Sequence, residues 1–459
     1  MLVVSRLVVG GAVLVVAGCG SDSADNGPNS SGAGGSGAGA TAGSGALSGS
    51  GGMGSGGVSG SGTTAANGGE SQAGAGPRGG ASGSGTSVGG VSAGMSGGAG
   101  NPSGSGGAPE WGVPSRPTGQ TCKVVSPQSM QPALLSATGC VDPTNPIKAA
   151  ATLVPYGIAT PLWSDGAEKH RYFALPDGGT IHVKDCTGDA PDCKDPVSGG
   201  GSYEDEGDWD FPDGTVFMKT FSFNGKLVET RLLMRKDKDN WWGFSYQWRE
   251  DQTEADLLGT SSDGYDAMVP GPSGTVNWHF PSRGQCLQCH VTAAGVSLGP
   301  ETSQLNFDFD YPNGAKGNQL DTLKHAGLFE KDPPARPVYP NPADTTLPLE
   351  ERARSYMHIN CGVCHRPGGN FTDFDARYAT PLKDTLLCGQ KAEKTIPSEY
   401  MLTDPMRVDP GHPEKSVVSL RMHSLEPTFR MPQIGSRVID DVGTKAMDDW
   451  ILSLTACPN

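Results

Sequence analysis

The stretch Asn360-Cys361-Gly362-Val363-Cys364-His365 decides how the rest of this 459-residue chain is interpreted. Two cysteines with two residues between them lie on one helical turn, so both thiols can add to the two vinyl groups of one haem. The histidine that follows is then placed to bind the iron. The same C-x-x-C-H pattern occurs at Cys286-Leu287-Gln288-Cys289-His290. The sequence therefore predicts two covalently bound haem c groups, with His290 and His365 as iron ligands.

A C-x-x-C pair has two other interpretations, a redox-active dithiol or half of a zinc site. An export signal at the start of the chain favours haem over both, because c-type haem is attached outside the cytoplasm. The predicted attachment sites are Cys286 and Cys289 for the first haem, and Cys361 and Cys364 for the second.

Residues 1–19 have the pattern of a lipoprotein signal peptide. The single charge of Arg6 precedes an apolar run that ends at Ala17 and is too short to span a bilayer. Val16-Ala17-Gly18-Cys19 looks like a bacterial lipobox, which predicts cleavage before Cys19 and acylation of its thiol. The alternative is ordinary secretion with an unmodified cysteine. We expect a lipoprotein of the cell envelope, on the periplasmic or surface side, and Gly20 favours the outer membrane over the inner.

Residues 20–110 are nearly all Gly, Ser and Ala and contain too little apolar surface to offset the entropy of ordering. This segment is predicted to be a disordered linker between the membrane and the folded part. The formal charge of −15, without a Lys/Arg run, argues against nucleic acid as a partner. The negative charge is compatible with binding to a basic redox partner, and it is equally compatible with a role in keeping the protein soluble.

The chain has 11 cysteines, and six remain after lipid and haem are assigned. An even remainder in an exported protein suggests three disulfides. Proximity along the chain favours pairing Cys122 with Cys140 and Cys186 with Cys193, which leaves Cys388 for Cys457. This pairing is one of about fifteen possible ones.

The predicted fold class is a multidomain α+β protein, in which a β-rich domain (111–275) precedes α-helical, cytochrome c-like haem regions. Short β-prone runs at 215–221 and 229–234 are separated by an Asn224-Gly225 turn. Dense aromatic residues between Trp209 and Trp248 favour core packing, and we expect an antiparallel β-sandwich or barrel-like domain. The acidic turn at 204–208 is interpreted as a solvated loop rather than a calcium site.

The first haem segment (276–345) leaves its distal iron ligand open. His325 ranks first because it lies downstream of the motif in a segment with a helical pattern, 318–329. The alternatives are a five-coordinate iron or one of the other chemically able side chains, which are His279, His358 and Met268.

The second haem domain (346–459) has the order of a small helical cytochrome c. A helix predicted over 348–360 runs into Cys361, and an amphipathic helix over 441–452 closes the chain. Met431, before Pro432, is the predicted ligand opposite His365, and His/Met ligation raises the reduction potential. The competing ligand is Met422, and core filling is the other interpretation of Met431. In the closing helix we expect Val442, Ala446 and Trp450 to pack on Tyr356 and Ala353.

Several further segments, taken with the two motifs, resemble the pattern of a known protein family. The two motifs resemble a family of exported bacterial two-haem c-type cytochromes when they are taken with residues 161–167, 209–215, 219–221, 229–232, 304–306 and 318–320. The similarity covers about residues 150 to 455 and implies haem binding and electron transfer, without implying a substrate. Residues 185–201 look like an insertion relative to the family pattern, and 161–167 is a candidate cover for a haem face.

The sequence thus predicts a membrane-anchored di-haem cytochrome that transfers electrons at the bacterial cell envelope between unidentified donor and acceptor proteins. It would be an electron carrier rather than a catalyst. One alternative is a two-haem enzyme, such as a peroxidase with one open iron. Another is the cytochrome subunit of an envelope dehydrogenase, with the β-rich region as its docking module.

Overall fold

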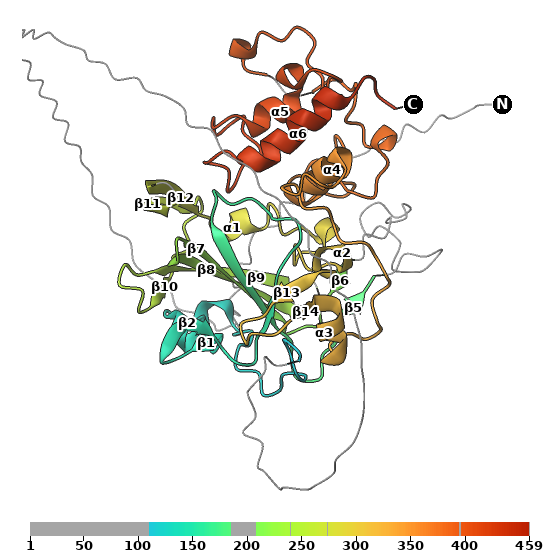
Figure 1. Cartoon of the computed structure of the whole chain (residues 1–459). Helices are drawn as coiled ribbons and strands as arrows, with labels where there is room; N and C mark the ends of the chain where they lie inside the picture. The colour runs from blue at the N-terminus through green and yellow to red at the C-terminus, as the bar shows by residue number, and fades with distance from the viewer. Residues whose placement is uncertain (1–109, 185–207, 239, 273, 394–395, 459) are drawn as a thin grey trace, which may run out of the picture. The chain divides into compact units, whose positions relative to one another are not determined.

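The computed structural model describes residues 110–184, 208–238, 240–272, 274–393 and 396–458 (Figure 1). The predicted signal peptide, Cys19, the linker, the Cys186–Cys193 pair and most of the acidic turn lie outside these residues. The described residues all belong to one unit by their contacts. The predicted domain boundaries near residues 275 and 345 stay predictions.

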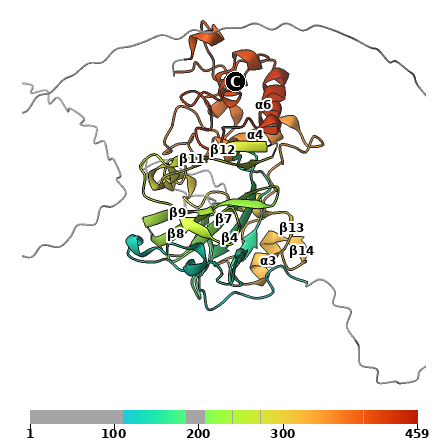
Figure 2. The same cartoon turned by 90° about the vertical axis from the view of Figure 1, so that its left-hand side faces the viewer.

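One antiparallel sheet of six strands carries the β-rich region, in the order β10-β9-β8-β7-β4-β3 (Figure 2). The strands are β3 (Val154–Tyr156), β4 (Glu168–Ala174), β7 (Val216–Phe223), β8 (Lys226–Asp237), β9 (Asn240–Trp248) and β10 (Ala255–Leu257). The β7–β8 turn is the predicted one, with φ of 49° at Asn224 and 76° at Gly225. Two successive left-handed residues suit the twist of a tight hairpin. Such short turns keep β7, β8 and β9 as neighbours in one sheet.

Four two-stranded ribbons complete the β structure. They are β1 (Val141–Asp142) with β2 (Asn145–Ala149), β5 (His182–Val183) with β6 (Trp209–Asp210), β11 (Tyr265–Gly271) with β12 (Gly274–Phe280), and β13 (Asp308–Asp310) with β14 (Lys316–Asn318). In the ranges given above, no second sheet exceeds two strands. The prediction of a β-rich region is confirmed, but the structure has a single main sheet where a sandwich was expected.

The two faces of the main sheet are covered differently. On one face, Met218, Leu232 and Phe244 are buried against an N-terminal segment that includes Leu135. That segment is closed by the Cys122–Cys140 disulfide. This N-terminal segment consists mostly of loops and is held closed by a disulfide. It covers the apolar face of the sheet, as a second sheet does in a β-sandwich.

The opposite face has an apolar cluster at each end. Phe173, Phe217 and Leu233 pack under residues of α2 (Thr302–Leu305), α3 (Gln319–His325) and the β13–β14 ribbon. At the other end, Phe221 and Phe223 pack against Trp278 and its neighbours on β12. Between the two clusters, the middle of this face carries charged side chains, which belong to the candidate site.

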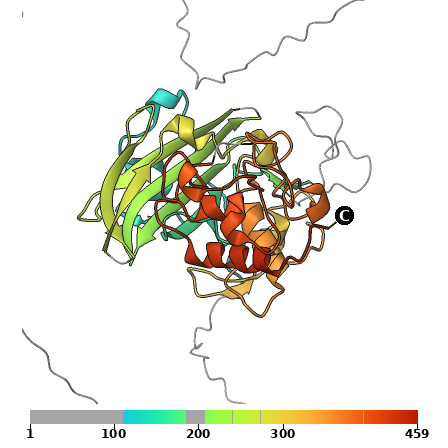
Figure 3. The same cartoon turned by 90° about the horizontal axis from the view of Figure 1, so that it is seen from above.

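The C-terminal part contains α4 (Leu349–Asn360), α5 (Val417–Met422) and α6 (Asp441–Ser453), so both predicted helices are confirmed. Figure 3 shows these helices, in orange and red, gathered beside the strands. At the α4–α6 contact, a Cβ added to Gly443 would lie 2.2 Å from ring carbons of Tyr356. Ala446 and Trp450 are buried there as expected, but Val442 is 48% exposed. The prediction for Val442 was wrong because Gly443, not Val442, faces Tyr356.

A disulfide joins Cys388 to Cys457 and so ties the end of the chain to the segment before α5. Together with Cys122–Cys140, it confirms two of the three predicted pairs. Among the described residues, no helix is long and apolar enough to cross a bilayer.

Candidate functional site

The first C-x-x-C-H motif starts on a short helix, α1 (Arg283–Cys286), directly after β12. Ser282 and Gln285 form a capping box, in which the Gln285 amide donates to Ser282 Oγ at 3.1 Å and the Ser282 amide donates to Gln285 Oε1 at 2.8 Å. A Cβ placed on Gly243 of β9 would lie 3.4 Å from Cys286 Sγ. The cap therefore sets Cys286 directly on the main sheet, close enough that a side chain at position 243 would be in contact with it.

The imidazole of His290 is oriented by a backbone carbonyl. Its Nδ1 donates to the Val296 oxygen at 2.5 Å, which leaves the Nε2 lone pair for a metal. Val296 reaches this position with φ of 59°, a conformation that is costly for a β-branched residue. Burial, assisted by the nearby charge of Lys219, lowers the pKa of His290 to about 4. At neutral pH the ring is therefore uncharged, the form that binds iron.

The second motif follows α4 without a break, because the Cys361 amide donates to the Met357 carbonyl at 2.8 Å. His365 Nδ1 donates to Asp373 Oδ1 at 3.1 Å, and its ring stacks on Phe374 with centroids 4.0 Å apart. Burial opposes ionisation of Asp373, but the hydrogen bond from His365 and the charge of Arg407 together hold its pKa below the ordinary value. Here an ionised carboxylate, rather than a carbonyl, orients the ring.

The two motifs touch one another. The thiol of Cys364 lies 3.3 Å from the Gln288 carbonyl, which also accepts from Asn370 Nδ2 at 2.7 Å. The thiols of Cys289 and Cys364 hydrogen-bond to each other. All four motif cysteines are free.

A pocket lies beside the second motif and the loop that follows the first, and it contains about 650 Å³ of empty space, part of it open to solvent. The main sheet contributes Arg171 and Lys219, and the loop after the first motif contributes residues 294, 295 and 297–301. The second motif and the end of α4 contribute His358, Val363 and Arg366. Groups from the second motif, from the loop after the first motif and from the charged centre of the sheet thus face one space.

A buried acid–base pair lines this pocket. His358 Nε2 lies 3.4 Å from Glu301 Oε1, while its Nδ1 accepts from the Tyr378 amide at 3.2 Å. Because Nδ1 is an acceptor, the ring proton sits on Nε2 and faces Glu301. The side chains of His358 and Glu301 are only 3% and 7% exposed. Of the four side chains considered as distal ligands, His358 is the one that lines the pocket, with both ring nitrogens engaged.

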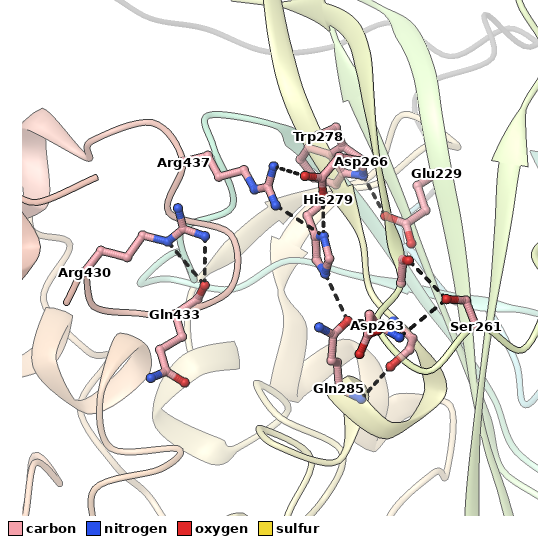
Figure 4. A network of polar contacts seen from close by, with 12 residues as sticks. Glu229, Ser261, Asp263, Asp266, Trp278, His279, Gln285, Arg430, Gln433 and Arg437 are labelled. Atoms are coloured by element: carbon pink, nitrogen blue, oxygen red, sulfur yellow. Dashed lines mark hydrogen bonds and ion pairs between the residues drawn. The ribbon is translucent and has the colours of Figure 1, made fainter. Parts of the chain in front are cut away.

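His279 is used elsewhere, in the polar network of Figure 4. Its Nδ1 lies 2.7 Å from Asp266 Oδ1, and its Nε2 lies 2.9 Å from Gln285 Oε1. Arg437, from the loop before α6, also binds Asp266 at 2.7 Å. This histidine connects the capping box of the first motif to the C-terminal part.

The structure places the other two distal candidates away from the pocket lining. The ring of His325 stacks on Trp111 with centroids 4.3 Å apart, and its Nε2 lies 3.1 Å from the Pro114 carbonyl. Figure 1 shows its helix α3 beside β13 and β14, well separated from α1. Met268 is 65% exposed on the β11–β12 ribbon. The structure therefore does not bring His325, the first choice, together with His290.

The two methionines considered for the second iron differ in surroundings. Met422 is 7% exposed in a core cluster with Met447 and Trp450, as a space-filling residue is. Met431 is half-buried between α5 and α6, and its amide donates to the Arg421 carbonyl at 2.9 Å. The role of Met431 as ligand stays a prediction.

The segment 161–167 contacts the residue that precedes the second motif. Asn360 Nδ2 donates to the Pro161 carbonyl at 3.2 Å, and Asn360 Oδ1 accepts from the Trp163 amide at 2.8 Å. Leu162 lines the pocket. The segment therefore borders the pocket, and its role as a cover for a haem face stays a prediction.

Sequence reasoning missed a row of cations on the main sheet. Arg171 of β4, Lys219 of β7 and Arg231 of β8 are direct cross-strand partners and so share one face. Glu229 beside them is fully buried and accepts two hydrogen bonds from Arg231, at 2.7 and 2.8 Å. The signal was present in Lys219-Thr220-Phe221 and Glu229-Thr230-Arg231-Leu232, because charges inside otherwise apolar strands are expensive to bury.

The residues at each motif fit a covalently attached haem. Both attachment positions hold free thiols, and each histidine has Nδ1 engaged, so that Nε2 is the nitrogen left for iron. Within the described part of the chain, no group of three or more His, Cys, Asp or Glu side chains could by itself hold a metal ion.

Compared with protein-family models, with curated proteins and with solved structures, the chain matches none of them.

Proposed function

We propose that this protein is a two-haem c-type cytochrome that transfers electrons. The observation that carries the proposal is the pairing, at both motifs, of free thiols with a histidine whose Nδ1 is already hydrogen-bonded. The haem, when bound, supplies a reversible Fe(II)/Fe(III) couple. The protein supplies the attachment, the ligand orientation and the surrounding charge.

The two histidines are oriented by different acceptors, and this difference supports two unequal redox sites. A carboxylate on Nδ1 makes an imidazole a stronger electron donor than a carbonyl does. Asp373 therefore acts to lower the potential of the second site, whereas ligation by Met431 would raise it. At the first site, the Val296 carbonyl accepts from Nδ1 and cations of the sheet lie nearby.

The contact between the motifs supports electron exchange inside one protein. Gln288 and Cys364 touch, and so do Cys289 and Cys364, which are attachment positions of different haems. Arg366 adds a further link, because its Nη1 donates to the Ala293 carbonyl at 3.1 Å. Two attachment sites held this close make transfer between them short-range.

A two-haem enzyme, such as a peroxidase, is the second candidate function. The observation that favours it is the buried Glu301–His358 pair on the wall of the pocket. A carboxylate and an imidazole in contact can relay a proton to or from a bound substrate. An electron carrier has no need for such a pair.

The lipid anchor at Cys19, the envelope location with the outer membrane preferred, and protein redox partners are part of the same proposal and depend on the sequence pattern alone.

The test is a redox titration of the full chain, expressed with haem-attachment machinery, and followed by the reduced spectrum with and without carbon monoxide. For an electron carrier we expect two c-type redox couples and a reduced spectrum that carbon monoxide does not change. A chain without a c-type spectrum would contradict the proposal. One haem that binds carbon monoxide and turns over peroxide would favour the enzyme, and Glu301→Gln should then lower turnover without lowering haem content.

A further inference from the structure

The centre of the sheet face under the first motif is a continuous polar row across five strands. Its members are direct cross-strand neighbours, in the order Tyr156, Arg171, Lys219, Arg231 and Ser245. Adjacent strands lie about 4.8 Å apart, so the three cations are stacked at close to that spacing. Like charges that face one another across strands are destabilising unless something compensates them.

Among the described residues, a carboxylate compensates only one end of this row. Glu229 binds Arg231 with two hydrogen bonds, and it also accepts from Trp278 Nε1 at 2.9 Å and from Ser245. Arg171 donates to the Lys169 carbonyl at 3.3 Å, which supplies no charge. In the described ranges, the Lys219 ammonium makes no hydrogen bond or ion pair.

The electrostatic consequence falls on Lys219 and Arg171. Burial, with the charges of Arg171 and Arg231, lowers the pKa of Lys219 to about 7. Burial also lowers the pKa of Arg171. Facing them across the pocket are the carboxylates of Asp208 and Glu301, of which Glu301 is engaged by His358, and the guanidinium of Arg366. An anion placed against the row would offset the excess positive charge.

The row also has a direction relative to the first motif. The charge of Arg231 acts on Cys286 and Cys289, and that of Lys219 acts on Cys289 and His290. Arg171 and Lys219, but not Arg231, line the pocket. The row thus leads from the cysteines into the pocket. A haem has its vinyl groups on one edge and its two carboxylates on the opposite edge, so attachment at the cysteines sends the carboxylates away from them.

We propose that Arg171 and Lys219 form the binding site for the propionate carboxylates of the first haem, while the Arg231–Glu229 pair holds the row in place. This inference rests on the proposed function, because it requires a haem at the first motif. Charge-assisted N–H to carboxylate hydrogen bonds are short and strong, and they would keep the propionates ionised. They would also satisfy Arg171 and Lys219, for which the described part of the chain supplies no paired carboxylate.

The test uses the full haem-loaded chain with Arg171→Gln and Lys219→Gln, and with Arg249→Gln as a matched control. Arg249 lies at the end of the same sheet and pairs with Asp256 at 2.7 Å, but it is 46% exposed. Haem content is counted by intact mass, and both midpoint potentials are measured from pH 5 to pH 8. Met431→Ala marks the potential that belongs to the second haem.

Each Gln variant should keep two haems and should lower the midpoint potential of the first haem. That potential is the one that does not change in Met431→Ala. Loss of a cation stabilises the ferric form, which lowers the potential. It also raises the propionate pKa toward neutrality, so that the lowered potential should fall further as pH rises. In the parent chain and in Arg249→Gln, the same potential should change less with pH.

Three outcomes separate this inference from the proposed function. A parent chain without haem overturns both. Two haems with both potentials unchanged in both Gln variants overturn the propionate site alone. A parent potential that shifts when sodium acetate replaces chloride at equal ionic strength also overturns it, because the row would then bind dissolved carboxylate. Should both Gln variants lose a haem, recovery of that haem in Arg171→Lys supports the need for a cation, and failure to recover it contradicts the site.

Discussion

The same ring nitrogen meets two different acceptors in the two motifs. Nδ1 of His290 donates to the backbone of Val296, and Nδ1 of His365 donates to the carboxylate of Asp373. The acceptor sets how much electron density reaches Nε2. Residues that never touch the iron would therefore tune the two sites separately.

Asp373→Asn should raise the potential of the second haem. The variant keeps a hydrogen-bond acceptor for His365 but removes the negative charge. The His365 imidazole then donates less electron density to the iron, and both this change and the lost charge disfavour Fe(III). We expect a rise on the order of 60 mV, a tenfold change in a one-electron equilibrium. A redox titration measures it, with Asp384→Asn, an exposed residue of the same region, as the control. A lower potential, or an equal shift in both haems, would contradict the role given to Asp373.

Glu229→Gln should destabilise the fold and leave haem attachment intact. Glu229 is fully buried and neutralises Arg231, so the substitution leaves a guanidinium without its carboxylate. Breaking a buried pair typically costs about 3–5 kcal/mol, and the low end is expected because Arg231 keeps part of its hydration. Urea unfolding measures the loss, with exposed Glu250→Gln as the control. Equal stability of the two variants would show that Glu229 does not compensate the row.

The sequence predicts the attachment residues but not their surroundings. A thioether site is local, since five consecutive residues contain both thiols and the histidine. The contacts of Arg171, Lys219 and Arg231 depend on strand register, which is a non-local property. His325 was ranked first by its helix alone, and the structure uses that ring to stack on Trp111.

At the scale of elements, the positions of the helices were predicted better than the elements that cover the faces of the sheet. The helices α4 and α6 have local signals, a proline before the first turn and an Asp440 cap whose side chain accepts from the Gly443 amide at 3.0 Å. Alternation in β7 and β8 shows which residues share a face. It does not show whether a second sheet, a ribbon or a disulfide-closed loop covers that face, and a sandwich was therefore expected.

Gly443→Ala should destabilise the α4–α6 contact. Helix propensity alone would favour alanine by about 1 kcal/mol. The added Cβ would lie 2.2 Å from the Tyr356 ring, however, and overpacking of this kind costs roughly 1–3 kcal/mol. Thermal unfolding should show a lower midpoint for Gly443→Ala, while Val442→Ala on the exposed side should change little. A stabilised Gly443→Ala protein would mean that the two helices are not held this closely.

At the scale of the whole molecule, the two motifs and the sheet form one site. The first motif rests on β9 through Cys286, the second extends α4, and the two meet at Gln288 and Cys364. The network through His279, Gln285 and Arg437 joins the first motif to the C-terminal part. The proposed two-haem unit would explain why the β-rich region and the helical region occur in one chain.

We propose that each motif attaches one haem, and intact mass spectrometry of the denatured full chain counts the attached haems. The chain is produced with haem-attachment machinery beside two matched variants, Cys286→Ser/Cys289→Ser and Cys361→Ser/Cys364→Ser. We expect two added haem masses in the parent chain and one in each variant. A parent chain whose mass shows no haem, or variants that keep both, would contradict this proposal.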